Sequence, residues 1–449
     1  MSAPATNWAE WLPTQARRLD PWLRVGRVVE ARGMIIESVG PDAGVGDLCM
    51  IQPAATGEQI PAEVVGFAGD NLLLMPFQQT HHIHPGTPVM RRQSTSRVPV
   101  GPEMIGRVLD GLGQPIDGRG MINASDSVRL YQDAPNPLHR RPIDRPFGSG
   151  VRAIDLFMPC GEGQRFGIFA GSGVGKSTLL GMIARNSTAD VNVVALIGER
   201  GRELGEFLHE VLGEEGLRKS VLIVSTGDQA PPLRVRAAFL ATAVAEYFRD
   251  RGQNVLLMMD SLTRLALAQR EIGLAVGEPP TARGFTPSVF SMLPRLLERA
   301  GQSDRGSITG AYTVLVEGDD FSEPVTDTVR GILDGHILLS RDLASEQQWP
   351  AIDVLGSLSR LSHRLYDDAQ SQLAGHAREV LARHRKYREL QTLGAYERGR
   401  NPELDRTMDE GERIWQLLRQ SPGEPTDRLE AFAALARTAQ AAPAGKARS

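Results

Sequence analysis

Short apolar runs separated by Gly, Pro and Asp dominate the chain between residues 22 and 97. The runs lie at residues 25–29, 34–36, 48–51, 64–67 and 72–75. Runs of this length and spacing are typical of the strands of a small all-β unit. Because closure removes exposed sheet edges, we predict a β-barrel domain over residues 22–97.

From residue 98 to residue 365 apolar strands alternate with helices, which is typical of an α/β domain with a mainly parallel sheet. The strands are predicted to be buried on both faces because their apolar runs are nearly continuous. They lie at residues 193–197, 221–225, 254–260 and 312–316. The fold class is therefore α/β, with the barrel before this domain.

Residues 366–437 are charged and have a helical pattern, so we predict a C-terminal helical domain there. Basic residues gather at 378–388, where they could bind nucleic acid. Glu379 and Glu389 interleave with them, which favours a solvated helix face. Residues 438–449 are small and aperiodic, and are predicted to be a disordered tail.

The N-terminal segment, residues 1–21, carries aromatic residues ahead of the barrel. A helix would place Trp8, Trp11 and Leu12 on one face, although Pro13 interrupts a continuous helix. The stripe either packs on the barrel or docks a partner. We favour docking, because exposed aromatic anchors suit a partner's groove.

Composition narrows the class of protein. The 449 residues are 41% hydrophobic and 23% charged, and the formal net charge is −4, which gives no sign of a global nucleic-acid or membrane field. Cys49 and Cys160 are too few for a disulfide framework. No apolar run is long enough to span a membrane, and residues 1–10 lack a secretory signal pattern. We expect a cytoplasmic protein.

A glycine-rich loop lies between an apolar strand and an apolar helix at residues 169–178. Such a loop lets backbone N–H groups approach phosphates, and the helix N-terminus adds positive potential. Lys176 would neutralise the β- and γ-phosphates of a nucleoside triphosphate, and the Ser177 hydroxyl would bind Mg²⁺. Ala170 replaces the first Gly of the strict pattern. The predicted binding residues are Ala170, Gly171, Ser172, Gly173, Val174, Gly175, Lys176, Ser177 and Thr178.

Two carboxylates follow predicted strands. Asp260 ends the strand 254–260, which we expect to lie beside the phosphate-loop strand and to deliver Asp260 to the Mg²⁺ shell. Glu199 follows the strand 193–197 and could orient the attacking water. Local sequence leaves open whether Glu199 has that role or is one more exposed glutamate.

A histidine cluster, His81, His82 and His84, lies in the barrel region. His82 and His84 would share one strand face and could bind a metal. No third ligand is spaced nearby, so a solvated turn is favoured.

Three motifs together are specific: the glycine-rich loop, residues 198–203 (GERGRE) and residues 350–360 (PAIDVLGSLSR). They resemble the rotary ATP synthase α/β family, which joins an N-terminal β-barrel, a RecA-like nucleotide domain and a C-terminal helical domain. Within that family the chain resembles the type III protein-export ATPases, most of all the flagellar ones. The stretches that carry this narrower likeness are residues 278–284, 287–290, 293–300, 306–309 and 312–320.

The resemblance implies roles for single residues. The family's catalytic carboxylate falls on Glu199, with Arg200 beside it; non-catalytic subunits of the synthase typically have Gln there. Its arginine finger, which completes a neighbouring subunit's site, falls on Arg360. Its base-stacking aromatic falls on Trp349, where Tyr is usual. A second adenine-contacting aromatic is not evident near residues 421–426.

The resemblance also implies ATP and Mg²⁺ as cofactors and a homohexamer as the assembly. Expected partners are a stator-like regulator at the N-terminus, a central stalk protein, an export gate, chaperones and exported substrates. Nucleic acid is not expected. Membrane association would be peripheral, through the export apparatus at the inner face of the cytoplasmic membrane.

Alternatives stay open at this point. The chain could serve an injectisome rather than a flagellum. It could be a catalytic β subunit of a rotary synthase, although the acidic segment of those subunits is absent and residues 402–410 fit export ATPases better. An RNA translocase of the Rho type is disfavoured, because the barrel region has aromatic residues only at Trp22, Phe67 and Phe77.

Overall fold

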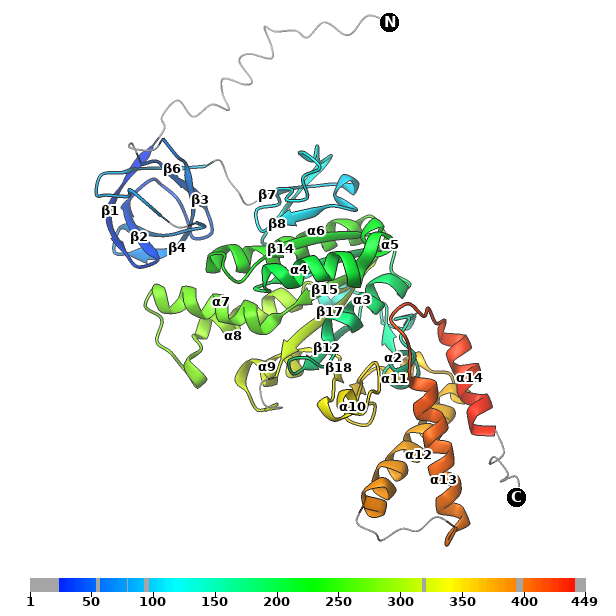
Figure 1. Ribbon diagram of the computed structural model, residues 1–449. Coiled ribbons are helices and arrows are strands. Elements are labelled where there is room, and N and C mark those ends of the chain that lie inside the picture. The colour runs from blue at the N-terminus through cyan, green and yellow to red at the C-terminus, as the bar shows by residue number, and fades with distance from the viewer. Residues whose placement is uncertain are drawn as a thin grey trace, which may run out of the picture. The chain divides into compact units, whose positions relative to one another are not determined.

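The computed structural model describes residues 24–53, 57–78, 80–92, 97–316, 320–392 and 399–440 (Figure 1). The chain divides into two compact units, Met1–Ser96 and Arg97–Ser449. The predicted docking segment at residues 1–21 and residues 441–449 of the predicted tail lie outside the described residues. Within the described part of the chain, every helix is too short or too polar to span a lipid bilayer.

The first unit is a closed antiparallel barrel with strand order β1-β2-β5-β4-β3-β6, which confirms the predicted barrel. Alternate side chains point inward, so Val28, Ile36 and Leu74 belong to one buried core. β6 was not predicted, because proline and arginine flank its short apolar run. The strands are β1 (Val25–Arg32), β2 (Ile35–Val39), β3 (Leu48–Ile51), β4 (Ile60–Ala68), β5 (Asn71–Pro76) and β6 (Pro88–Arg91).

The histidine cluster lies in an exposed turn ahead of β6, as the solvated-turn interpretation predicted. His82 has a positive φ of 62°, and His84 Nδ1 lies 2.9 Å from the carbonyl oxygen of Pro85. No group of three or more potential metal ligands was found among the residues that the structure describes.

The second unit is built on a sheet of order β19-β18-β12-β17-β15-β13-β14-β8, in which all pairings except β18–β19 are parallel. The predicted mainly parallel α/β sheet is therefore confirmed. Its strands are β8 (Val108–Asp110), β12 (Arg165–Ala170), β13 (Val191–Ile197), β14 (Ser220–Ser225), β15 (Asn254–Asp260), β17 (Ser307–Leu315), β18 (Gly335–Leu338) and β19 (Leu358–Ser359). Shorter pairings add β16 (Gly301–Gln302) to β17, β7 (Arg97–Val100) to β9 (Asp126–Arg129), and β10 (Pro146–Phe147) to β11 (Cys160–Gly161).

One strand position was predicted wrongly. β15 does not lie beside the phosphate-loop strand β12, because β17 pairs with both and separates them. The order of the buried strands depends on pairing between segments far apart in the chain, which local sequence does not show. Asp260 still reaches the phosphate loop, since parallel strands end at the same edge of the sheet.

Helices cover the sheet, and one core joins it to the C-terminal helices. Alternate residues of β12, such as Phe166 and Ile168, pack in this core with Leu180 and with Ile414 and Leu435 of the C-terminal helices. The helices are α2 (Arg152–Phe157), α3 (Lys176–Asn186), α4 (Gly201–Glu206), a π-helix (Phe207–Leu212), α5 (Gly213–Arg218), α6 (Pro231–Asp250), α7 (Leu262–Ala275), α8 (Pro287–Leu297), α9 (Pro324–Ile332), α10 (Arg341–Ser345) and α11 (Ser362–Leu365). Short 3₁₀ turns lie at Pro102–Met104, Pro137–His139 and Ala282–Gly284.

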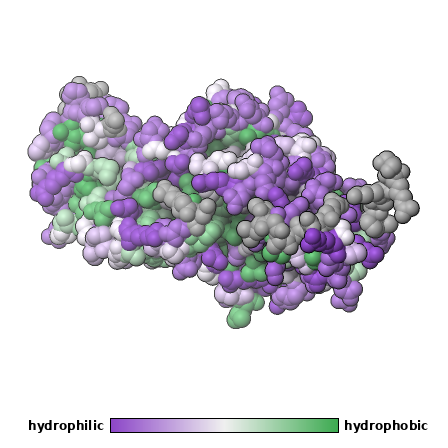
Figure 2. All heavy atoms as spheres, turned by 60° about the horizontal axis from the view of Figure 1, so that its bottom comes forward, coloured by the Kyte–Doolittle hydropathy of each residue, from purple (hydrophilic) through white to green (hydrophobic). Residues whose placement is uncertain are grey.

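The C-terminal helices are α12 (Asp368–Thr392), α13 (Pro402–Leu418) and α14 (Arg428–Gln440), in agreement with the predicted helical domain (Figure 1). α14 continues to Gln440, into the segment predicted to be disordered. Two basic residues of α12 form ion pairs with the nucleotide domain: Arg385 with Asp353 at 2.6 Å and Arg388 with Glu346 at 2.9 Å. They hold α12 to the nucleotide domain, which neither the nucleic-acid nor the solvated-face interpretation anticipated. Figure 2 shows a face on which hydrophilic residues predominate, with hydrophobic ones scattered among them.

Asp155 of α2 is a buried carboxyl at the contact between the sheet domain and the C-terminal helices. Its Oδ1 accepts hydrogen bonds from Ser149 N and Oγ at 2.9 and 2.7 Å, and Oδ2 has no hydrogen-bond partner. Burial raises the pKa of Asp155 to about 6. A raised carboxyl pKa favours the protonated form in the folded state, so the stability contribution is present at acid pH and is lost as pH rises through about 6.

We therefore expect Asp155→Asn to stabilise the protein above pH 7. A shift of two pKa units corresponds to roughly 3 kcal/mol in the free energy of unfolding. The gain should disappear near pH 3, below the ordinary pKa of aspartate, where the carboxyl is mostly protonated in both states. Denaturant unfolding of both chains at the two pH values checks this; an equal effect at both would contradict it.

Candidate active site

The glycine-rich loop joins β12 to α3 at the carboxyl edge of the parallel sheet. Gly173 and Gly175 have φ of 79° and 83°, which residues with a Cβ rarely adopt. A Cβ on Gly175 would also lie 2.8 Å from Cζ3 of Trp349. Because α3 begins at Lys176, the positive end of its dipole faces the loop. The loop has the geometry of a phosphate-binding loop.

Lys176 lies between the two predicted carboxylates. Its Nζ is 2.5 Å from Asp260 Oδ1 and 3.3 Å from Glu199 Oε1. Glu199 is 8% exposed and Asp260 is 3% exposed. Burial disfavours the charged ammonium, but the two carboxylates more than offset it and raise the pKa of Lys176. The structure thus brings together three of the residues predicted from separate motifs.

Two residues that the sequence analysis missed hold these carboxylates. The buried Thr313 hydroxyl of β17 donates to Asp260 Oδ1 at 2.7 Å. Arg264, in the first turn of α7, places Nε 3.3 Å from Glu199 Oε1. A sequence signal for Arg264 was available. Ser261, directly after Asp260, caps the next helix, so the first turn of that helix, with Arg264, lies at the same edge of the sheet as Asp260. No local pattern distinguishes Thr313.

A cavity of about 750 Å³ opens over the loop on the side of Glu199. It is lined by Lys176, Ser177, Glu199, Arg200, Arg264 and Arg341, among others. The cationic groups suit a polyphosphate. The predicted Mg²⁺ ligands, the Ser177 hydroxyl and the Asp260 carboxylate, are a donor set that fits Mg²⁺, which takes few protein ligands and completes its shell with phosphate oxygens and water.

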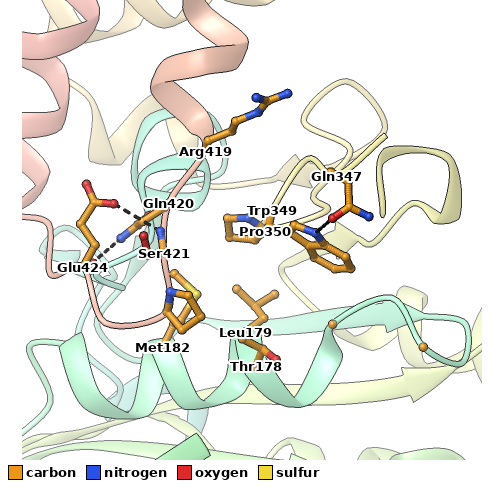
Figure 3. Close-up of a pocket in the computed structure, with 13 residues that line it drawn as sticks. Thr178, Leu179, Met182, Gln347, Trp349, Pro350, Arg419, Gln420, Ser421 and Glu424 are labelled. Atoms are coloured by element: carbon orange, nitrogen blue, oxygen red, sulfur yellow. Dashed lines mark hydrogen bonds between the residues drawn. The ribbon is translucent and has the colours of Figure 1, made fainter. Parts of the chain in front are cut away.

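A second cavity of about 620 Å³ adjoins the loop on the other side (Figure 3). Trp349 and Pro350 lie on one side of it, Gln420, Ser421 and Glu424 on the other, and Met182 projects from α3. Trp349 is 37% exposed, so its ring is available for stacking. Among the described residues that line this cavity, Trp349 is the aromatic one; Pro422 is exposed and supplies apolar surface, whereas Met182 is only 1% exposed.

The remaining predicted residues do not enter the Lys176 cluster. Arg360 follows β19, is exposed, and donates from Nη2 to the carbonyl oxygen of Arg330 at 3.3 Å. The side chain of Arg200 is 79% exposed and lies 3.8 Å from Glu203. Arg360 is therefore separate from its own subunit's Lys176, whereas Arg200 lies at the rim of the cavity.

Comparison with known proteins agrees with this geometry. Residues 150–359 match the model of the ATP synthase alpha/beta family, nucleotide-binding domain. Residues 366–437 match the model of the T3SS EscN ATPase C-terminal domain. The two matches cover most of the sheet domain and of the C-terminal helices.

Similar proteins are found over nearly the whole chain. The flagellum-specific ATP synthase of Bacillus subtilis is 50% identical over 93% of this chain and 95% of its own length. The type 3 secretion system ATPase of Xanthomonas euvesicatoria is 50% identical over 91% of this chain and 92% of its own. The assembled ATPase EscN of the enteropathogenic E. coli type III secretion system superposes with a TM-score of 0.86 at 43% identity, over 92% of this chain and 99% of that one. The predicted resemblance is confirmed. The chain is an ATPase of the ATP synthase alpha/beta family, in the group that contains the flagellum-specific and type 3 secretion ATPases.

Proposed function

We propose that the chain hydrolyses Mg-ATP to energise flagellar type III protein export, releasing chaperones and unfolding substrates at the export gate. The observation that carries the chemistry is the cluster of Lys176, Glu199 and Asp260 at the phosphate loop. The flagellar assignment is supported by the 50% identity to the flagellum-specific ATP synthase of Bacillus subtilis.

Each residue of the cluster has a separate role. Lys176 neutralises the β/γ-phosphates, which take the place of the carboxylates that it now contacts. Glu199 orients and polarises the attacking water, with Arg264 as a positioning residue that holds its carboxylate. Asp260, oriented by Thr313, and Ser177 hold Mg²⁺. The metal, when bound, neutralises the charge that develops on the phosphates.

The second cavity is proposed to hold the base. Trp349 stacks on one face of adenine, and the exposed Pro422 ring contacts the other. This arrangement needs no second aromatic near residues 421–426, because the exposed Pro422 ring supplies apolar surface there.

Arg360 is proposed to act in trans, on the γ-phosphate of a neighbouring subunit, with Arg200 at the rim of each site. A homohexamer around a central stalk is supported by the assembled ATPase EscN and by its complex with the central stalk EscO. Exposure of Arg360 outside its own site supports the same arrangement.

We expect hydrolysis to rise with protein concentration as rings form, because Arg360 is useful only across an interface. Arg360→Ala chains should bind ATP and assemble but turn over poorly. Mixing them with Lys176→Ala chains should restore partial activity, since some interfaces then combine an intact loop with an intact finger. Absence of rescue at any ratio, with mixed rings confirmed, would contradict the trans role.

The protein is proposed to work in the cytoplasm at the inner face of the cytoplasmic membrane, with chaperones, exported substrates and the export gate as partners. An injectisome role is the second candidate, supported by 50% identity to the type 3 secretion system ATPase of Xanthomonas euvesicatoria. Nucleic acid is not a proposed partner; stimulation of ATP hydrolysis by RNA would contradict this.

We propose that residues 1–21 dock a stator-like regulator through Trp8 and Trp11. Deleting residues 1–19 should abolish regulator binding and leave basal hydrolysis unchanged. Pull-down with the regulator and thermal unfolding measure the two effects. A loss of thermal stability with binding unchanged would favour packing on the barrel instead.

A further inference from the structure

Arg360 is linked by backbone pairing to its own subunit's phosphate loop. β12, which leads into the loop, pairs with β18, and β18 pairs with β19, which ends immediately before Arg360. The backbone N–H of Leu339, after β18, donates to the carbonyl oxygen of Phe169 at 2.9 Å, and Arg360 N donates to Asp334 O at 3.0 Å. A shift of the loop strand would therefore be passed to the residue that faces the neighbour.

Side chains make a second link between the loop strand and Arg360. Phe169, the penultimate residue of β12, is buried, and a Cβ on Gly167 would lie 2.4 Å from its ring, so the ring lies against its own strand. The Phe321 ring lies 6.5 Å from the Phe169 ring. The Arg330 guanidinium lies 5.9 Å from the Phe321 ring, and Arg330 O accepts the hydrogen bond from Arg360.

Phe321 is the shared element of this link. It is half-buried, lies just before α9, and contacts the loop strand on one side and α9, through Arg330, on the other. It lines neither of the cavities described above. A ring in this position can transmit a displacement of β12 to the backbone that holds Arg360, but it cannot itself touch the nucleotide of its own site.

We propose that Phe321 is a positioning residue that couples nucleotide bound in one subunit to the Arg360 that this subunit presents to its neighbour. The proposal rests on the trans role of Arg360 in the proposed function. Nucleotide binding reorders the phosphate loop and moves Phe169 with β12. Through Phe321 and Arg330 this movement fixes the position of the Arg360 side chain. A subunit whose own site holds nucleotide then promotes hydrolysis in the site of the neighbouring subunit.

Rings assembled from two different variant chains can distinguish a coupling role of Phe321 from a purely structural packing role. An acceptor chain, Arg360→Ala, has an intact loop and no finger. A donor chain, Glu199→Gln, binds nucleotide without turning it over and supplies the finger. Only interfaces between an acceptor loop and a donor finger are active, so Phe321→Ala can be placed in either chain and its effect assigned to the loop or to the finger.

Placed in the donor, Phe321→Ala should lower kcat of the mixed rings by between about tenfold and 10²-fold, as expected when a catalytic group is misplaced by about an ångström. Placed in the acceptor, it should leave kcat and KM unchanged, which also shows that the variant folds and assembles. Phe321→Leu in the donor should recover part of the activity. Phe290→Leu, another half-buried ring removed from this path, is the matched control.

A second donor tests the coupling itself. Lys176→Ala donors, which cannot fill their own site, should support less hydrolysis than Glu199→Gln donors, and Phe321→Ala should remove that difference. Equal loss in both placements, or loss in the acceptor alone, would overturn the proposal in favour of packing. If unmodified acceptor and donor chains give no activity in confirmed mixed rings, the trans role of Arg360 fails and the coupling fails with it.

Discussion

A Lys176→Ala chain is expected to lose Mg-ATP hydrolysis entirely, because Lys176 is the lysine that, among the described residues, contacts the two buried carboxylates at the loop. The same change should lower the thermal stability of the protein measured without nucleotide. Glu199 and Asp260 would keep their burial and lose their shared cation. Removing one partner from a buried ion pair typically costs about 3–5 kcal/mol, and partial solvent access here places the expected cost at the lower end.

Steady-state hydrolysis and thermal unfolding measure the two effects on one preparation. Lys219→Ala is a matched control, because Lys219 is also half-buried but donates only to Ser187 O, at 3.2 Å, away from the cavities. That control should keep wild-type turnover. If Lys176→Ala retained most of its turnover, the assignment of this loop as the catalytic phosphate site would be wrong.

Much of the fold followed from the sequence because each element has a strong local signal. Continuous apolar runs gave β13, β14 and β15, and the glycine pattern located the loop between β12 and α3. Asp260 and Glu199 could be predicted as site residues because they lie at the ends of two parallel strands. Parallel strands end at the same edge of a sheet, so these two carboxylates meet there.

The order of the strands could not be read in the same way. β17 and β15 are both buried, and their order depends on pairing between residues far apart in sequence. Thr313 is one threonine inside a buried strand, and its contact with Asp260 exists only because β17 lies next to β15.

The pattern of charges along α12 predicted only some of the ion pairs that its basic residues form. The interleaved acids suggested a solvated face, and Arg383 does pair with Glu379 at 2.5 Å on the same helix. Arg385 and Arg388 instead pair with Asp353 and Glu346 of the nucleotide domain. A basic residue on a helix gives no local sign of whether its partner is one turn away or on another element.

Glu199→Gln is expected to lower kcat by about 10²–10⁴-fold and to leave nucleotide affinity nearly unchanged, since loss of a positioned proton acceptor typically has this effect. Glutamine has the same shape, and its amide oxygen can keep the contact that Glu199 Oε1 makes with Arg264 Nε. Asp260 still pairs with Lys176, so the phosphate-binding lysine stays buried beside a carboxylate. The change therefore removes the base and little else.

Equilibrium binding of a fluorescent ATP analogue and steady-state hydrolysis, measured on assembled rings, separate affinity from turnover. Glu214→Gln is the matched control: Glu214 is a fully solvated glutamate of α5, 3.9 Å from Arg218, and its replacement should leave both quantities unchanged. If Glu199→Gln keeps more than about half of wild-type kcat, a loss far below the 10²-fold minimum for a general base, Glu199 is one more buried partner of Lys176 and another group activates the water. If it loses affinity instead, its main role is to orient Lys176 for the phosphates, and the catalytic base must be sought elsewhere on the rim of the same cavity.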